Sequence, residues 1–154
     1  MTKIVWKSQY ETGIPIIDEQ HRRLFEALDQ VQEAVADGST KDEIRSLIQA
    51  LLAATREHFR TEEAIMTRHG FPDLLAHTRE HEMMMEKLED LNQRFEGSHD
   101  SMALLVTTFM GGWLRHHISE GDFSYVQFIK SGLVASGSAD LLLALWDQGS
   151  ITFL

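Results

Sequence analysis

Apolar residues recur along this chain at the spacing of one helix face in four long segments. In the first segment Leu24, Leu28 and Val31 follow one another at intervals of three or four residues, and the later segments repeat that pattern. The four segments, separated by short connections, cover about 18–37, 41–69, 73–95 and 101–128. Short connections favour antiparallel neighbours, so the pattern predicts an all-α fold, an antiparallel up-down-up-down four-helix bundle.

Local signals predict where several of these helices begin and end. Asp18 is a candidate N-cap of the first helix, and Gly38 ends it. Thr40 and Glu43 have the spacing of a capping box at the start of the second helix, which runs for roughly 28 residues before Gly70 stops it.

The N-terminal residues 1–17 are predicted to form an extended arm, because Gly13 and Pro15 oppose a helix. The apolar residues that would anchor this arm to the bundle are Ile4, Val5, Trp6 and Tyr10.

The composition changes after Lys130, which we take as the end of a domain covering residues 1–130. Residues 131–138 are small and loop-like, and an apolar cluster follows between Leu141 and Trp146. We predict that this C-terminal extension, residues 131–154, docks on the bundle, since exposed apolar patches are uncommon on monomers.

Candidate metal ligands lie on all four predicted helices. His58 and Glu62 are four residues apart, as are His77 and His81, and this spacing places each pair on one helix face. In an antiparallel bundle these positions share one layer with candidates on the first and fourth helices. The whole set is His21, His58, Glu62, His77, His81, His117 and Asp122. Seven ligands exceed the four of an ordinary zinc site and suit two metal ions bridged by the carboxylates.

Two alternative interpretations, each based on one helix alone, compete with this set of ligands. His77 and His81, with Glu80 between them, match the H-x-x-E-H pattern of some zinc peptidases, in which the glutamate acts as a general base. On the fourth helix, spacing alone favours His116 and Glu120, which are four residues apart. His117 and Asp122 are five apart and match one face poorly unless the helix loosens.

Composition narrows the classes of protein. The formal net charge of −10 argues against general nucleic-acid binding. The absence of cysteine excludes disulfides, iron–sulfur clusters and thiolate zinc sites. We find no signal peptide and no stretch of about 18 apolar residues, and we therefore expect a cytoplasmic protein without membrane insertion.

The chain resembles the bacterial hemerythrins, a family of non-haem di-iron oxygen-binding proteins. The resemblance rests on four stretches: Asp-Glu-Gln-His at 18–21, His-x-x-x-Glu at 58–62, His-x-x-x-His at 77–81 and Trp-Leu-x-x-His-Ile-x-x-x-Asp at 113–122. It implies that His117 and Asp122, rather than His116 and Glu120, are ligands.

The resemblance also implies how the site would work. It implies two iron ions with a bridging oxide or hydroxide, one held by His77, His81 and His117 and the other by His21 and His58. Dioxygen would bind reversibly at the single open position on the second ion. Gln20 is a candidate to orient a ligand histidine. Candidates for an apolar wall that slows water entry are Trp113, Leu114, Ile118 and the run 83–85.

The resemblance leaves several functional classes open. The leading expectation is oxygen carriage, storage or scavenging by a monomer that is not an enzyme. Dioxygen is then the ligand, and an oxygen-consuming enzyme or a signalling protein is a candidate partner. The alternatives are an oxygen or redox sensor acting through a partner, and a di-iron peroxidase or oxidase. Such enzymes are typically richer in carboxylates than this histidine-dominated set.

Overall fold

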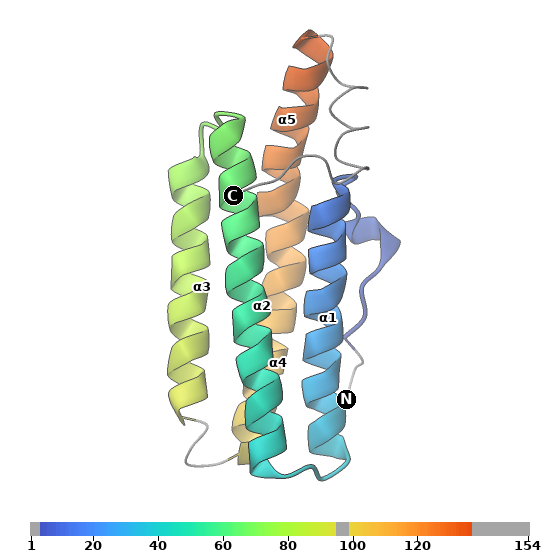
Figure 1. The fold of residues 1–154 in the computed structure, drawn as a ribbon, viewed down its shortest axis with the longest axis vertical. Coiled ribbons are helices and arrows are strands. Elements are labelled where there is room, and N and C mark those ends of the chain that lie inside the picture. Colours follow the sequence, from blue (N-terminus) through green and yellow to red (C-terminus); the bar gives the residue numbers. More distant parts are fainter. Residues whose placement is uncertain (1–3, 95–98, 137–154) are drawn as a thin grey trace.

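A computed structural model describes residues 4–94 and 99–136, and within these residues the protein is entirely helical. The elements in chain order are the short 3-10 helix η1 (Ser8–Tyr10), α1 (Pro15–Ala36), α2 (Lys41–Arg68), α3 (Leu74–Arg94), α4 (His99–His116), the π-helical segment η3 (His117–Asp122) and α5 (Phe123–Ser136). α4, η3 and α5 follow one another without a break and form the fourth rod of the bundle (Figure 1). The prediction of a four-helix bundle is confirmed.

Neighbouring helices in the chain are neighbours in space. α1 packs against α2 and α4, and α3 packs against α2 and α4, which closes the bundle (Figure 1). Two apolar clusters fill it. The larger includes Leu24, Phe59 and Met84, and the smaller includes Ile17 and Ile65 near the N-terminal end of α1. On α1 the candidate ligand His21 lies between Ile17 of the smaller cluster and Leu24 of the larger, and on α2 Glu62 lies between Phe59 and Ile65 in the same way, so a buried polar layer separates two apolar ones.

The start of α2 agrees with the sequence, and the start of α1 does not. The side chain of Thr40 accepts from the backbone N–H of Glu43, and the Glu43 carboxylate accepts from the backbone N–H of Thr40, which confirms the capping box. α1 begins at Pro15, three residues before the predicted cap, so the assignment of Asp18 as N-cap is wrong. Proline is tolerated at the first helical position because its missing N–H would have no intrahelical partner there.

Asp18 instead ties the N-terminal arm to α1. Its Oδ1 accepts from the backbone N–H and the hydroxyl of Thr12, each at 2.8 Å, and its Oδ2 accepts from the N–H of Gly13 at 3.1 Å. From the other side, Lys130 Nζ donates to the carbonyl of Thr12 at 2.7 Å. Gly13 has a φ of 84°, which favours glycine, and a Cβ there would lie 2.7 Å from Lys130 Nζ, so a larger residue would also displace the end of the lysine side chain.

The predicted anchors of the arm are mostly correct. Ile4 and Tyr10 are buried, and Tyr10 stacks on Phe25 with ring centroids 5.5 Å apart. Trp6 is half-buried, and its ring lies under the guanidinium of Arg22. Val5 is 46% exposed, so its assignment as an anchor is wrong.

The last helix is longer than the sequence suggested. α5 continues to Ser136, so the expectation of a loop is wrong for residues 131–136. Adding residues to an existing helix needs no new nucleation, and this lets small residues continue the helix. The predicted docking of the apolar extension falls on residues 137–154, which lie outside the described residues. Within residues 4–94 and 99–136, no helix is long and apolar enough to cross a membrane.

Candidate metal centre

All seven predicted ligands converge in the buried polar layer of the bundle, and each is at most 5% exposed. They form two groups of potential ligand atoms, each group lying within 4.8 Å. One group contains three histidines of α3 and η3, and the other contains the histidines of α1 and α2; both contain Glu62 and Asp122. The members are His77, His81 and His117 in the first group, and His21 and His58 in the second.

Each shared carboxylate presents one oxygen to each group. Glu62 Oε2 lies 3.1 Å from His81 Nε2, while its Oε1 lies 3.3 Å from His58 Nε2. Asp122 Oδ1 lies 3.1 Å from His117 Nε2, while its Oδ2 lies 3.1 Å from His21 Nε2. This is the arrangement that two carboxylates need in order to bridge two cations.

The π-helical segment explains how residues five apart reach one site. A π-helix bonds residues i and i+5, so η3 brings His117 and Asp122 to the same face of the rod. Both are buried, whereas His116 and Glu120 face outward, with side chains 73% exposed and ring and carboxylate 4.0 Å apart. Of the two pairs left open by spacing, the structure brings His117 and Asp122 into the cluster.

Unpartnered polar atoms test whether the site suits metal ions. Buried polar atoms without hydrogen bonds are rare and costly in folded proteins. Among the described residues, seven of the buried side-chain atoms that lack a hydrogen-bond partner belong to this cluster. They are both ring nitrogens of His21, Nε2 of His58 and of His77, Oε2 of Glu62, and both carboxylate oxygens of Asp122. Imidazole nitrogens and carboxylate oxygens aimed at a common centre suit iron, and the residues therefore fit a pair of metal ions.

Three of the histidines are oriented by acceptors behind them. Nδ1 of His58 lies 2.9 Å from Oε1 of Gln20, whose amide nitrogen donates to the hydroxyl of Thr61 at 3.0 Å. This contact agrees with the role predicted for Gln20. The Thr61 bond fixes the amide so that its oxygen faces the ring, and Nε2 of His58 then points to the centre.

Carboxylates take the same place behind two other histidines. Nδ1 of His81 lies 2.9 Å from Glu63 Oε1, and Nδ1 of His117 lies 3.2 Å from Glu80 Oε2. No pattern in the sequence pointed to Glu63 beyond its place next to Glu62. Glu80 is 58% exposed and contacts the outer edge of His117, a position unsuited to the general base of a zinc peptidase.

Tyr125 is a buried partner of the site that sequence reasoning missed. Its hydroxyl donates to Glu62 Oε1 at 2.9 Å. Burial, together with the charges of Glu62 and Asp122, holds the pKa of Tyr125 well above its ordinary value. The hydroxyl therefore keeps its proton and restrains the orientation of the Glu62 carboxylate. Its place three residues after Asp122, on the same side of the rod, was the available signal.

Aromatic and apolar side chains surround the cluster. Phe59 stacks on His81 with ring centroids 3.8 Å apart, and Trp113 stacks on His117 at 4.3 Å. Leu114 and Ile118, predicted for the apolar wall, are fully buried. The prediction is wrong for Met83, which is 70% exposed because it lies on the outer face of α3.

Charges within the cluster shift its pKa values. Burial lowers the pKa of His21, but close contacts with the negative carboxylates of Asp122 and Glu62 outweigh it and raise the pKa to about 9. The same balance raises the pKa of His77 to about 10, whereas burial prevails at His58 and lowers its pKa. Burial raises the pKa of both carboxyl groups, yet the surrounding histidines bring each below its ordinary value. The carboxylates are therefore ionised at neutral pH, and a cation must displace protons from His21 and His77.

Comparisons with known proteins bear on the same region. Residues 12–129 match the Hemerythrin HHE cation binding domain. The chain is 31% identical over 133 residues to the bacteriohemerythrin of Stenotrophomonas maltophilia (strain R551-3), with 86% of each chain covered. It is 29% identical over 133 residues to the bacteriohemerythrin of Pseudomonas aeruginosa (strain LESB58), again covering 86% of each. The myohemerythrin of Riftia pachyptila is 25% identical over 121 residues, which cover 79% of this chain and 89% of that protein. All seven residues of the cluster lie within the matched domain.

Proposed function

Because the chain belongs to the hemerythrin family, we propose that it binds dioxygen reversibly at a carboxylate-bridged non-haem di-iron centre. The role we propose is oxygen carriage, storage or scavenging. The observation that carries the proposal is the pair of ligand groups that share Glu62 and Asp122. A site for a single metal ion would leave either His21 and His58 or the other three histidines without an ion to bind.

The seven residues divide between the two ions as the two groups do. His77, His81 and His117 would hold one ion, His21 and His58 would hold the other, and Glu62 and Asp122 would serve both. Two ferrous ions held there would supply the two electrons that reversible dioxygen binding requires. Because His77, His81 and His117 would give their ion one protein ligand more than His21 and His58 would give the other, dioxygen would bind on the side of His21 and His58.

The protein surroundings favour binding over turnover. Five neutral imidazoles and two carboxylates leave little net charge to bury when two dications and a hydroxide are present. Leu114 and Ile118 are fully buried on the same rod as His117 and favour a dry environment on their side of the cluster, which would slow protonation and loss of a bound ligand as a reduced product. Tyr125 and Gln20 keep Glu62 and His58 in place without offering a readily lost proton. We therefore propose that the protein is not an enzyme.

An optical experiment tests the proposal. Iron-loaded protein is reduced without air, exposed to dioxygen and then purged with inert gas, while its spectrum is recorded. A charge-transfer band that appears with dioxygen and disappears on purging is expected. Prompt, irreversible conversion to the ferric form would instead favour the sensor or oxidase alternatives. Elemental analysis of the same sample should give two irons per chain.

A further inference from the structure

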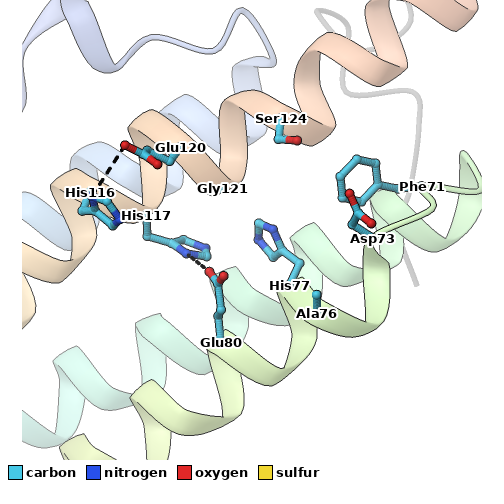
Figure 2. Close-up of a pocket in the computed structure, with 10 residues that line it drawn as sticks. All are labelled: Phe71, Asp73, Ala76, His77, Glu80, His116, His117, Glu120, Gly121 and Ser124. Carbon is cyan, nitrogen blue, oxygen red and sulfur yellow. Dashed lines mark hydrogen bonds and ion pairs between the residues drawn. The ribbon is translucent and has the colours of Figure 1, made fainter.

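A cavity of about 310 Å³ opens from the surface onto the three-histidine side of the cluster. It lies between the start of α3 and the η3–α5 part of the fourth rod (Figure 2). His77 and His117 form part of its inner wall. The cavity therefore reaches the three-histidine side of the cluster, away from the side of His21 and His58 where dioxygen would bind.

The mouth of the cavity is acidic. Asp73, Glu80 and Glu120 line it, and none of the ten described residues that line it is lysine or arginine. Asp73 and Glu80 come from the α3 side, and Glu120 comes from η3, where its carboxylate is turned toward the ring of His116 (Figure 2). A cleft lined by one sign of charge concentrates ions of the opposite sign and speeds their entry. The neutral dioxygen molecule gains nothing from such a field, whereas a divalent cation does.

His77 is the ligand at this wall that no acceptor restrains. His58, His81 and His117 each have an acceptor behind Nδ1, but among the described residues His77 has none. His77 is only 5% exposed, and its Nε2 has no hydrogen-bond partner. Its ring can turn toward the cavity without breaking a hydrogen bond at its outer nitrogen.

Gly121 leaves the space for that movement. A Cβ at this position would lie 3.2 Å from the ring of His117 and 3.3 Å from the ring of His77. The backbone of η3 thus passes directly over both rings, and any side chain at 121 would press on them. The cavity reaches His77 and His117 because residue 121 is glycine.

We propose that this acidic cavity is the port through which ferrous ions enter and leave the centre, with His77 as the ligand that swings aside. The proposal rests on the ligand roles given under the proposed function. Asp73 and Glu120 attract the hydrated cation at the mouth, and Glu80 holds His117 in place while His77 moves. Transfer from water to the cluster then proceeds by ligand exchange: protein ligands replace water on the cation, and the protons that the cation displaces from the imidazoles pass to water.

The first test removes charge from the mouth. Asp73→Asn with Glu120→Gln is compared with Asp42→Asn with Glu19→Gln, a control that removes the same charge from exposed sites whose carboxylates pair with Arg45 and Arg23. Asparagine and aspartate are equally good at helix starts, so Asp73→Asn spares α3. Iron release from loaded ferrous protein into excess neutral 2,2′-bipyridine is timed without air, as is uptake of ferrous ion by the metal-free form.

We expect uptake and release to slow about fivefold or more at low salt in the mouth variant relative to the control, with the difference shrinking at high salt. The final iron content should stay at two per chain in both. Equal rates of iron uptake and release in the mouth variant and the control at every salt concentration would overturn the proposal that iron passes through this cavity. Failure of the loaded wild-type protein to bind dioxygen reversibly would overturn the proposed function but leave the port standing.

The second test narrows the cavity without changing charge. Gly121→Ala should slow uptake and release at every salt concentration, because its methyl group presses on both rings. Gly112→Ala is the matched control, since a Cβ there meets no atom within 4 Å. Equal rates in Gly121→Ala and Gly112→Ala overturn the role of His77 as the swinging ligand.

Discussion

Two rods of the bundle each supply one imidazole and one shared carboxylate, and they do so with different backbone geometry. α2 places His58 and Glu62 four residues apart in a regular helix. The fourth rod places His117 and Asp122 five residues apart, across the π-helical η3. The regular helix obtains this arrangement from ordinary side-chain spacing, whereas the other rod must change its backbone hydrogen bonding.

The difference shows what a wider helical turn can accomplish. A π segment is seldom used in proteins and appears mostly at functional sites. Here it turns Asp122 inward next to His117, and it brings the backbone at Gly121 against two ligand rings. A regular helix at the same place would favour the outward-facing pair His116 and Glu120. The irregular backbone therefore decides which residues reach the cluster.

The most damaging change should be loss of a shared carboxylate from either rod. Asp122→Ala and Glu62→Ala should each reduce the iron content from two per chain to one or less, because both groups of ligands lose a member. His117→Ala should weaken assembly as well, while His116→Ala should keep two irons. Elemental analysis after loading measures this. Iron loss in His116→Ala with retention in His117→Ala would break the comparison.

The hydrogen-bond acceptors that orient His117 and His58 should contribute unequally to metal affinity. Glu80→Ala removes a carboxylate behind His117, and Gln20→Ala removes a neutral amide behind His58. Loss of such an acceptor typically weakens metal binding about 10- to 100-fold. We expect the larger loss in Glu80→Ala, because hydrogen bonds to a charged acceptor are the stronger ones. Competition with a chelator of known affinity measures both, and equal losses would contradict the expected order.

The pH dependence of stability should show which shared carboxylate, Asp122 or Glu62, interacts more strongly with the histidines. In the metal-free protein His21 and His77 have raised pKa values, about 9 and 10. Their contribution to stability is therefore full below the unfolded value near 6.5 and is lost as the pH rises through 9 to 10. Thermal melting of the metal-free protein should fall across this window, while that of the loaded protein should not.

The close contact of each ring with Asp122, 3.1 Å for His21 and 3.2 Å for His77, raises these two pKa values more than the contact with Glu62 does. Asp122→Asn should accordingly flatten the alkaline fall in melting temperature more than Glu62→Gln. If the melting temperature fell more steeply with pH in Asp122→Asn than in Glu62→Gln, Glu62 rather than Asp122 would be the main cause of the raised pKa values.

The smallest effect concerns Tyr125, whose hydroxyl donates a hydrogen bond to Glu62, the shared carboxylate on α2. Tyr125→Phe removes the hydroxyl that donates to Glu62 and should lower the free energy of unfolding by about 1–2 kcal/mol, with two irons retained. Tyr10→Phe is the control, since Tyr10 contributes through stacking on Phe25, and it should change stability by less than about 0.5 kcal/mol. Denaturant titration of the loaded protein compares them, and equal values would remove the role given to Tyr125.

Sequence alone predicted the parts of this structure that depend on regular repetition. Apolar periodicity predicted the four rods, and i, i+4 spacing placed His58 with Glu62 and His77 with His81. The same geometry failed at η3, because helical spacing assumes 3.6 residues per turn, and only the family resemblance selected Asp122. Glu63 escaped prediction because its contact with His81 depends on how α2 and α3 are rotated against each other, which the pattern within one helix does not determine. Spacing places Tyr125 on the same side as Asp122, but its bond to Glu62 likewise depends on how its rod packs against α2.

The hydrogen bonds of Thr12 with Asp18 and Lys130 form a clasp that fastens the N-terminal arm to α1 and α5, and this clasp has a consequence for resistance to force. Asp18 and Lys130 hold Thr12 from opposite sides, and the Lys130 bond joins positions 118 residues apart in the chain. A molecular machine that unravels proteins from the N-terminal end would meet this clasp at Thr12 before it unwound α1, which begins at Pro15. Because the clasp fastens the arm to both α1 and α5, such a pull is shared between the first helix and the last.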